Sequence, residues 1–313
     1  MEKDSKIYVA GHNGLVGSAI VRKLKEDGYK NVLKFDRKAF DLSDPDSLNY
    51  IFTNYDIDYV FLAAAKVGGI KANSDYKASF IYDNLTIQTN VIHHAYTHGV
   101  KKLLFLGSSC IYPKFAEQPI KEEYFLSGKL EESNDAYAIA KIAGIKMCQS
   151  YTEQYGFNTI SLMPTNLYGP NDNFDLATSH VLPALIRKVH EAKIENKSTI
   201  EVWGSGEPRR EFLYVDDLAD ACVFLMNNYD SPEIINVGVG QDLSIKELVH
   251  TIANVVGYQG DFIWDRTKPD GTPRKLLDVS KLNNVGWKAS TSLEEGLRKT
   301  YEWYKKRNWC EVK

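Results

Sequence analysis

A glycine-rich turn near the N-terminus constrains this chain more than any other feature of its sequence. The turn reads Gly-His-Asn-Gly-Leu-Val-Gly over 11–17, directly after an apolar run over 7–10, and it leads into a helical pattern over 16–27. Glycines at this spacing let the backbone turn tightly and approach a diphosphate, whose charge the exposed amides and the helix N-terminus hold. An ordinary glycine-rich turn is the simpler alternative, but strand, turn and helix in this order are the context that a dinucleotide site requires. The pattern predicts a dinucleotide-binding turn made of Gly11, His12, Asn13, Gly14, Leu15, Val16 and Gly17.

The first half of the chain alternates short apolar runs with amphipathic segments, which predicts an α/β fold with a Rossmann-type, doubly wound parallel sheet. The expected strands cover 7–10, 31–36, 59–63, 102–107, 159–163 and 234–238. The expected helices cover 16–27, 81–98, 136–155, 179–191 and 215–226, the last with Asp216 as a plausible N-cap. The regular alternation of expected strands and helices stops after Pro164, which suggests a smaller C-terminal domain. We expect one domain of 1–170 plus about 209–239 and a second of about 171–208 plus 240–313.

The charge and composition of the chain exclude several classes of protein. The net charge is −3 without a long run of either sign, which disfavours a nucleic-acid partner. No apolar stretch reaches the roughly 20 residues of a membrane span, and the first residues lack the apolar core of a signal peptide. Four cysteines without C-x-x-C spacing fit a reducing, cytoplasmic location. His93 and His94 lack a third ligand at metal spacing, so no metal site is predicted.

The residues after the second expected strand leave the type of cofactor open. Asp36 stands where an acidic residue usually binds the adenosine ribose, which favours NAD. Arg37 and Lys38 follow at once and could bind a 2′-phosphate, which favours NADP, although they could also be ordinary solvated residues.

A tyrosine and a lysine four residues apart indicate carbonyl chemistry. Tyr137 and Lys141 share one face of an expected helix, and a nearby ammonium lowers the pKa of a phenol. Such a phenol can protonate a carbonyl oxygen as hydride arrives, and the lysine can also bond the nicotinamide ribose. Ser108 and Ser109 end the fourth strand, where sheets of this type bind ligands, so a serine hydroxyl can hold the substrate oxygen.

These motifs resemble the extended short-chain dehydrogenase/reductase family. The segments 164–170, 210–212 and 215–217 also resemble that family's strand-end and substrate-diphosphate motifs. The resemblance implies a homodimer in which 81–98 and 136–155 form a four-helix bundle. It also implies further NADP(H) contacts from Asp36, Arg37, Asp41, Leu42, Ala64, Lys141, Pro164, Asn166, Leu167 and His180.

Longer segments narrow the resemblance within that family. The segments 64–70, 107–113, 137–144, 171–174 and 268–275 are similar to the NADPH-dependent 3,5-epimerase/4-reductases of GDP-4-keto-6-deoxy-D-mannose. This similarity implies that Cys110 and His180 are the acid/base pair at C3 and C5, because protons beside a ketone are acidic. It further implies a GDP-sugar pocket that contains Asn166, Lys188, Trp203, Arg210 and Asp270. Asn13 and Asp36 depart from the pattern of some members, which carry basic residues there.

Several alternatives stay open at the level of sequence. A plain 4-reductase, including one acting on a GDP-4-keto-heptose, a 4-epimerase and a 4,6-dehydratase share this fold. A dehydratase would normally carry Thr-Asp-Glu near the fourth strand, where this chain has Ser-Cys-Ile. A redox-sensing binding module is the non-enzymatic alternative, but such proteins tend to lose the tyrosine or the lysine that this chain keeps.

Overall fold

A six-stranded parallel sheet forms the centre of the molecule. The computed structural model describes residues 1–268 and 270–307, so Pro269 of the 268–275 motif, Cys310 and the last residues of the second expected domain lie outside the described part. All neighbouring strands of the sheet run parallel, which confirms the predicted fold class. Their order is β2 (Asn31–Leu33), β1 (Lys6–Ala10), β3 (Tyr59–Leu62), β4 (Lys102–Leu106), β5 (Thr159–Pro164) and β10 (Ile235–Val237).

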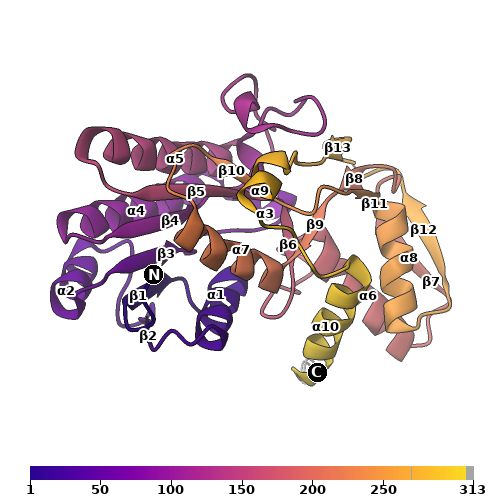
Figure 1. The fold of residues 1–313 in the computed structure, drawn as a ribbon. Helices are drawn as coiled ribbons and strands as arrows, with labels where there is room; N and C mark the ends of the chain where they lie inside the picture. The colour runs from indigo at the N-terminus through magenta and orange to yellow at the C-terminus, as the bar shows by residue number, and fades with distance from the viewer. Residues whose placement is uncertain (269, 308–313) are drawn as a thin grey trace.

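Helices cover both faces of this sheet (Figure 1). One face packs against α2 (Pro45–Tyr55), α4 (Lys77–Thr97) and α5 (Asp135–Tyr155), and the short α3 (Ile70–Asp75) precedes α4. The other face packs against α1 (Leu15–Glu26), α7 (Val215–Asn228) and α9 (Ser280–Val285). Because both faces are covered, every residue of β4 and β5 is buried, which explains why most of their side chains are apolar.

A smaller lobe stands beside the sheet, at the right of Figure 1. Its helices are α6 (Val181–Ile194), α8 (Ile245–Val256) and α10 (Leu293–Lys306). Its strands form three small sheets: β7 (Thr199–Trp203) with β12 (Asp261–Asp265); β8 (Arg209–Arg210) between β11 (Leu243–Ser244) and β13 (Arg274–Lys275); and β6 (Asn166–Tyr168) with β9 (Phe212–Tyr214). Buried side chains such as Leu182, Leu248 and Leu297 give this lobe its own apolar core. The division into the two domains with the boundaries given above stays a prediction.

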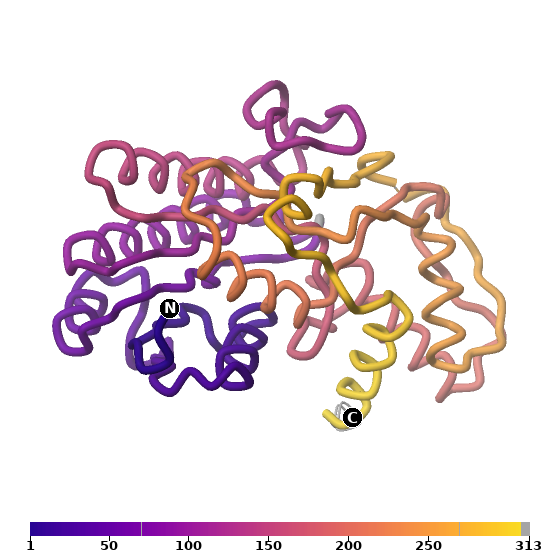
Figure 2. Tube along the Cα trace, viewed as in Figure 1, coloured from indigo at the N-terminus to yellow at the C-terminus, as the bar shows by residue number. Residues whose placement is uncertain are grey.

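The chain returns from the smaller lobe to the main sheet after β12. Figure 2 shows this returning segment, residues 270–285, passing back toward the sheet. Ile120 and Leu277 form an isolated parallel bridge, and the Leu276 amide donates to Oε1 of Gln118 over 2.8 Å. The 3₁₀ turns η1 (Ser109–Ile111) and η2 (Glu122–Tyr124) lie in the connection between β4 and α5 that meets this segment. The returning segment therefore brings residues near the C-terminus to the edge of the sheet where β4 ends.

Several boundaries differ from the expectations drawn from sequence: α4 begins at Lys77 rather than at 81, and α6 covers Val181–Ile194 rather than 179–191. Two further differences have a clear physical cause. The strand expected over 31–36 ends at Leu33, and the ring of Phe35 instead packs edge-on against those of Phe40 and Tyr55. The helix expected to open at 215–217 does begin at Val215, but its N-cap is Tyr214 rather than the expected Asp216, because β9 runs straight into α7. The Asp216 carboxylate instead forms an ion pair with Arg22 of α1.

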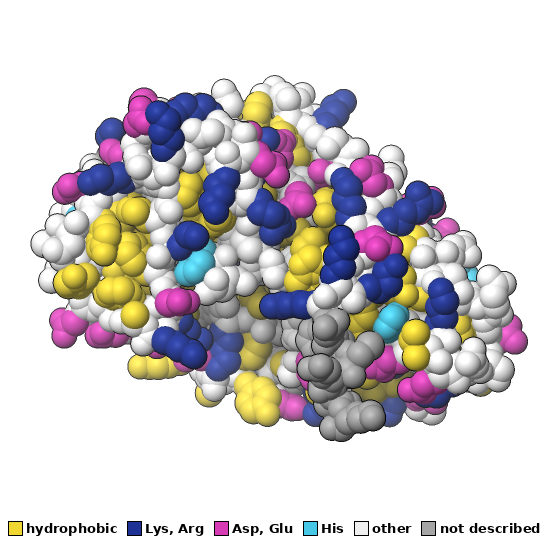
Figure 3. Space-filling view, turned by 90° about the horizontal axis from the view of Figure 1, so that it is seen from below, with side chains coloured by type: hydrophobic (Ala, Val, Ile, Leu, Met, Phe, Trp, Pro, Cys, Tyr) yellow, Lys and Arg dark blue, Asp and Glu magenta, His cyan; other side chains and the backbone are white. Residues whose placement is uncertain are grey.

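The surface carries charges of both signs. Figure 3 shows basic, acidic and apolar side chains interspersed over one face of the molecule. Among the helices that the structure describes, none combines the length and the apolar character needed to cross a bilayer.

Candidate active site

The glycine-rich turn lies between the ends of β1 and β3, where the strand order of the sheet reverses. Gly11 has a φ of +88°, and a Cβ at this position would lie 2.7 Å from both Cα and N of Ala64. Gly14 is the N-cap of α1 and supplies no side-chain hydrogen bond, so the first amides of the helix remain available. A Cβ on Gly17 would meet the Gly11 carbonyl oxygen at 2.1 Å, so α1 packs directly on the turn. This geometry fits a dinucleotide diphosphate at the start of α1.

The residues expected around the adenosine ribose gather beyond the end of β2. Nδ2 of Asn13 donates to Oδ1 of Asp36 over 3.1 Å, which ties the glycine-rich turn to this edge. The backbone amide and hydroxyl of Ser43 donate to Asp41 and lower the pKa of its carboxyl. The Arg37 side chain is 81% exposed and lies 3.8 Å from the Asp41 carboxylate, so it is free to approach a bound phosphate.

Ser108 and Tyr137 lie together where β4 ends and α5 begins. Ser108 is the N-cap of η1, Tyr137 lies in the first turn of α5, and their side chains are hydrogen-bonded. Lys141, one helical turn further, is buried and donates to the Leu106 carbonyl over 2.8 Å. Its Nζ lies 5.9 Å from the centre of the Tyr137 ring. The structure therefore brings the three predicted catalytic side chains to one place.

The lowered pKa that was expected for the Tyr137 phenol is wrong, because the structure raises this pKa. Burial, followed by the charge of Cys110, raises the pKa of the phenol, and Lys141 does not counteract this. The Lys141 ammonium is directed at a backbone carbonyl instead, and burial lowers its own pKa to about 8. Tyr137 consequently carries its proton at neutral pH, which is the form that a proton donor to a carbonyl requires.

Cys110 lies beside this pair and receives contacts from two distant segments. Nδ2 of Asn134 lies 3.3 Å from its sulfur, and Nζ of Lys275 lies 3.5 Å from the same atom. His180 is the N-cap of α6, and its pKa is lowered by burial and then by the positive charge of Lys275. The His180 side chain is accessible to solvent although many protein atoms surround it. Lys275 thus contacts the sulfur of Cys110 and also lowers the pKa of His180, the two members of the predicted acid/base pair.

The residues expected to bind the GDP-sugar lie mainly in the smaller lobe. Trp203 ends β7 with 58% of its side chain exposed, and the ammonium groups of Lys188 and Lys268 lie 5.6 and 5.5 Å from its ring centre. Asp270 accepts hydrogen bonds from the Ser205 amide over 2.7 Å and the Ser205 hydroxyl over 2.8 Å.

Two further predicted substrate residues meet at the junction of the lobes. Burial lowers the pKa of Arg210, and the nearby Asp270 carboxylate opposes this. Asn166 follows β5, the strand that ends at Pro164, and donates to the Glu211 carbonyl over 2.8 Å. Leu167 lies in β6 beside Asn166. An arginine at this junction can bind a diphosphate bidentately.

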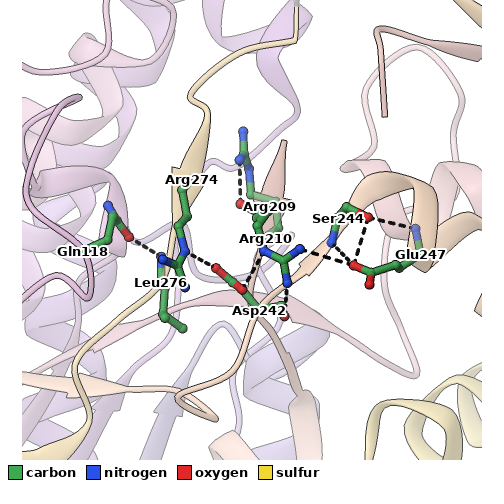
Figure 4. A network of polar contacts seen from close by, with 8 residues as sticks. All are labelled: Gln118, Arg209, Arg210, Asp242, Ser244, Glu247, Arg274 and Leu276. Carbon is green, nitrogen blue, oxygen red and sulfur yellow. Dashed lines mark hydrogen bonds and ion pairs between the residues drawn. The ribbon is translucent and has the colours of Figure 1, made fainter. Parts of the chain in front are cut away.

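No sequence pattern indicated the residues that hold β13 in place. Asp242 accepts hydrogen bonds from Nε of Arg209 over 2.9 Å and from Nε of Arg274, and its side chain is only 5% exposed (Figure 4). The fully buried Glu211 carboxylate accepts from the amides of Val239, Gly240 and Leu277. The segment 268–275 stood out by its resemblance, but only the fold brings its last residue to Cys110.

Comparisons with known proteins give a family match and relatives that are similar over nearly the whole chain. The model of the NAD dependent epimerase/dehydratase family matches residues 7–238. GDP-L-fucose synthase 1 of Arabidopsis thaliana is 59% identical over 309 residues, covering 99% of this chain and 95% of the relative.

Two solved structures are similar over almost their whole length. A GDP-6-OMe-4-keto-L-xylo-heptose reductase from C. jejuni superposes with a TM-score of 0.93 at 40% identity, covering 98% of this chain and 99% of the other. A GDP-L-fucose synthetase from Naegleria fowleri bound to NADP superposes with a TM-score of 0.91 at 33% identity, covering 98% and 95%. With its glycine-rich turn, its Ser–Tyr–Lys site and a family match over more than half of its length, the chain belongs to the NAD dependent epimerase/dehydratase family.

Proposed function

We propose that this chain is an NADPH-dependent enzyme that epimerises GDP-4-keto-6-deoxy-D-mannose at C3 and C5 and reduces C4, forming GDP-L-fucose. The observation that carries the proposal is the position of the Cys110 thiol. It lies next to the Ser108–Tyr137 pair and is contacted by Asn134 and Lys275. A plain reductase needs the Ser108–Tyr137 pair, but its reaction does not require the Cys110 thiol. The similarity to named GDP-L-fucose synthases over nearly the whole chain supports the same activity.

The side chains can perform both parts of this reaction. The substrate ketone would accept hydrogen bonds from Tyr137 and Ser108, which stabilise the enolate formed when a neighbouring carbon loses its proton. Cys110 and His180 would remove that proton and return one to the opposite face, first at one carbon and then at the other. Arg210 would hold the diphosphate, so that the sugar reaches the catalytic residues in one orientation.

When bound, NADPH would supply the hydride for the reduction of C4. The close approach of Gly11 to Ala64 and the uncapped start of α1 fit its diphosphate, and the exposed Arg37 fits a 2′-phosphate. The neighbour bound to NADP supports this choice over NAD. Tyr137 would deliver its proton to O4 as the hydride arrives, and Lys141 would bond the nicotinamide ribose after leaving the Leu106 carbonyl.

Incubation of the enzyme with GDP-4-keto-6-deoxy-mannose and NADPH in deuterated water tests the proposal. We expect deuterium at both C3 and C5 of the product, measured by NMR and mass spectrometry. Cys110→Ser serves as the matched variant, and we expect it to lose most of the exchange while still binding NADPH. Reduction without deuterium at either carbon would contradict the epimerase activity.

A GDP-heptose 4-reductase is the second candidate, and the similarity to the C. jejuni reductase favours it. The two candidates differ in their dependence on the thiol, because a plain 4-reductase should barely respond to Cys110→Ser. Comparing the rates of NADPH oxidation with the 6-deoxyhexose and with a GDP-4-keto-heptose identifies the preferred sugar.

We also propose a homodimer built on the outer faces of α4 and α5, which pack extensively against each other. Tyr82 on α4 and Ile139 on α5 are 68% and 46% exposed, so an apolar surface is available to a second copy. Light scattering of wild type and of Ile139→Asp tests this, and a wild-type monomer would contradict it.

A cytoplasmic location stays a prediction from the cysteine pattern; in the described part of the chain Cys110, Cys148 and Cys222 are free thiols.

A further inference from the structure

Two hydrogen-bond donors converge on the sulfur of Cys110. One is the Asn134 amide at 3.3 Å and the other is the Lys275 ammonium at 3.5 Å. An ammonium can only donate, so it matches a sulfur that has lost its proton better than a neutral thiol. The surroundings of Cys110 are therefore complementary to a thiolate.

Lys275 differs from the other cations that line the pocket beside Cys110. Lys114 is paired with Glu131 over 2.9 Å, and Arg274 is paired with Asp242. Within residues 1–268 and 270–307, no carboxylate lies within ion-pair distance of Lys275. The other titratable groups that act at this place are Tyr137 and His180. With no carboxylate to neutralise it, the charge of Lys275 is free to act on the sulfur.

The backbone around Lys275 is anchored on both sides. Arg274 is held by Asp242, the Leu276 amide donates to Gln118 over 2.8 Å, and the Leu277 amide donates to Glu211 over 3.0 Å (Figure 4 shows the first two contacts). Lys275 itself pairs with Arg210 across β13 and β8. A long, flexible lysine side chain is thus presented to the sulfur from a fixed strand.

We propose that Lys275 is a positioning residue of the epimerisation site, whose ammonium stabilises the Cys110 thiolate as the base. The thiolate takes a proton from a carbon beside the ketone, an S–H bond forms, and the electron pair of the C–H bond becomes the enolate. This assignment goes beyond the proposed function and rests on it for the role of the thiol. The pair formed by β8 and β13 then serves two purposes, with Arg210 facing the diphosphate and Lys275 facing the sulfur.

Alkylation of Cys110 by iodoacetamide tests the contact without any substrate. The rate is measured against pH for wild type, Lys275→Met and Lys275→Arg, with Cys110→Ser as the blank for other thiols. An opposite charge at this range shifts a protonation equilibrium by roughly one to three pH units. We therefore expect Lys275→Met to react about tenfold more slowly at neutral pH, with its profile moved upward by about one pH unit. Lys275→Arg should recover most of the reactivity.

Lys30→Met is the matched control, because Lys30 pairs with the exposed Asp4 just before β2, at the opposite edge of the sheet. It removes the same charge and should leave the profile unchanged. Circular dichroism and NADPH binding establish that Lys275→Met is folded; if it is not, Lys275→Gln, which keeps a polar side chain but removes the charge, takes its place and is expected to show the same slower alkylation. Coinciding profiles of wild type and Lys275→Met would overturn the inference.

Deuterium exchange at C3 and C5 separates this inference from the proposed function. Slow exchange in Lys275→Met with near-normal exchange in Lys275→Arg supports both. If Lys275 controls alkylation but wild type incorporates no deuterium, the proposed epimerase is wrong while the action of Lys275 on the sulfur stands. If wild type incorporates deuterium at both positions but the alkylation rate does not depend on Lys275, the role of Lys275 is wrong while the proposed epimerase stands.

Discussion

Adding one methyl group at Gly11 should cost more stability than the same change at Gly28, and the structure explains the difference. Both glycines have positive φ, +88° and +79°, so alanine at either position adopts a left-handed conformation that costs roughly 1–2 kcal/mol. At Gly28 no other atom lies within 4 Å of the new Cβ. At Gly11 the methyl would lie 2.7 Å from backbone atoms of Ala64.

Ala64 follows β3 in the centre of the sheet, so its backbone can move little to accommodate the new methyl group. Overpacking of this kind costs roughly 1–3 kcal/mol in addition to the conformational term. We expect a loss of about 2–5 kcal/mol in the free energy of unfolding for Gly11→Ala, against about 1–2 kcal/mol for Gly28→Ala.

Urea unfolding followed by circular dichroism measures both losses, and the dependence on urea should be the same for both variants if only the folded state is affected. Binding of NADPH should weaken for Gly11→Ala alone, because the methyl also occupies the crevice between β1 and β3. Equal losses of stability in the two variants would refute the close approach of the turn to Ala64.

Other changes have equally definite outcomes. Tyr137→Phe should lower the rate of NADPH oxidation by roughly 10²–10⁴ while leaving NADPH affinity unchanged; a smaller loss would mean that another group protonates O4. Arg210→Ala should raise KM for the GDP-sugar far more than it lowers kcat, and an unchanged KM would place the diphosphate elsewhere. Burial raises the pKa of Asp242, but the hydrogen bonds of Arg274 and Arg209 outweigh it, so the pKa is lowered overall. The Asp242 carboxylate therefore stabilises the fold at neutral pH, and this contribution disappears as pH falls below its ordinary pKa of 3.8. Unfolding of Asp242→Asn should show a loss of about 1–3 kcal/mol at neutral pH that shrinks in acid, and a loss independent of pH would contradict this account.

The local features of the fold were predictable because neighbouring residues determine them. The glycine-rich turn, the buried strands and the helix that carries Tyr137 and Lys141 each follow from spacing or apolar runs within a few residues. Two of the errors in element boundaries arose where tertiary contacts, rather than neighbouring residues, determine where a strand ends or which residue caps a helix. The pairing of β2 with β1 ends at Leu33, and the continuous passage from β9 into α7 displaces Asp216 from the N-cap.

The electrostatics of the site could not be predicted, because they depend on the environment rather than on residue type. The Y-x-x-x-K spacing indicates that Lys141 lies near Tyr137, but the burial that raises the pKa of the phenol arises only in the folded chain. The contact between Cys110 and Lys275 joins residues 165 positions apart, and local sequence patterns contain no information on such a pair.

The path of the chain after β12 limits how far this enzyme could be shortened. A fragment ending at residue 238, where the family match stops, would retain all six strands of the main sheet. It would lack Asp270, Lys275 and the Leu277 amide that Glu211 binds, so one wall of the catalytic cleft would be missing. Such a truncated protein is expected to hold the dinucleotide yet be unable to turn over a sugar, which makes the last quarter of the chain as indispensable to catalysis as the nucleotide fold.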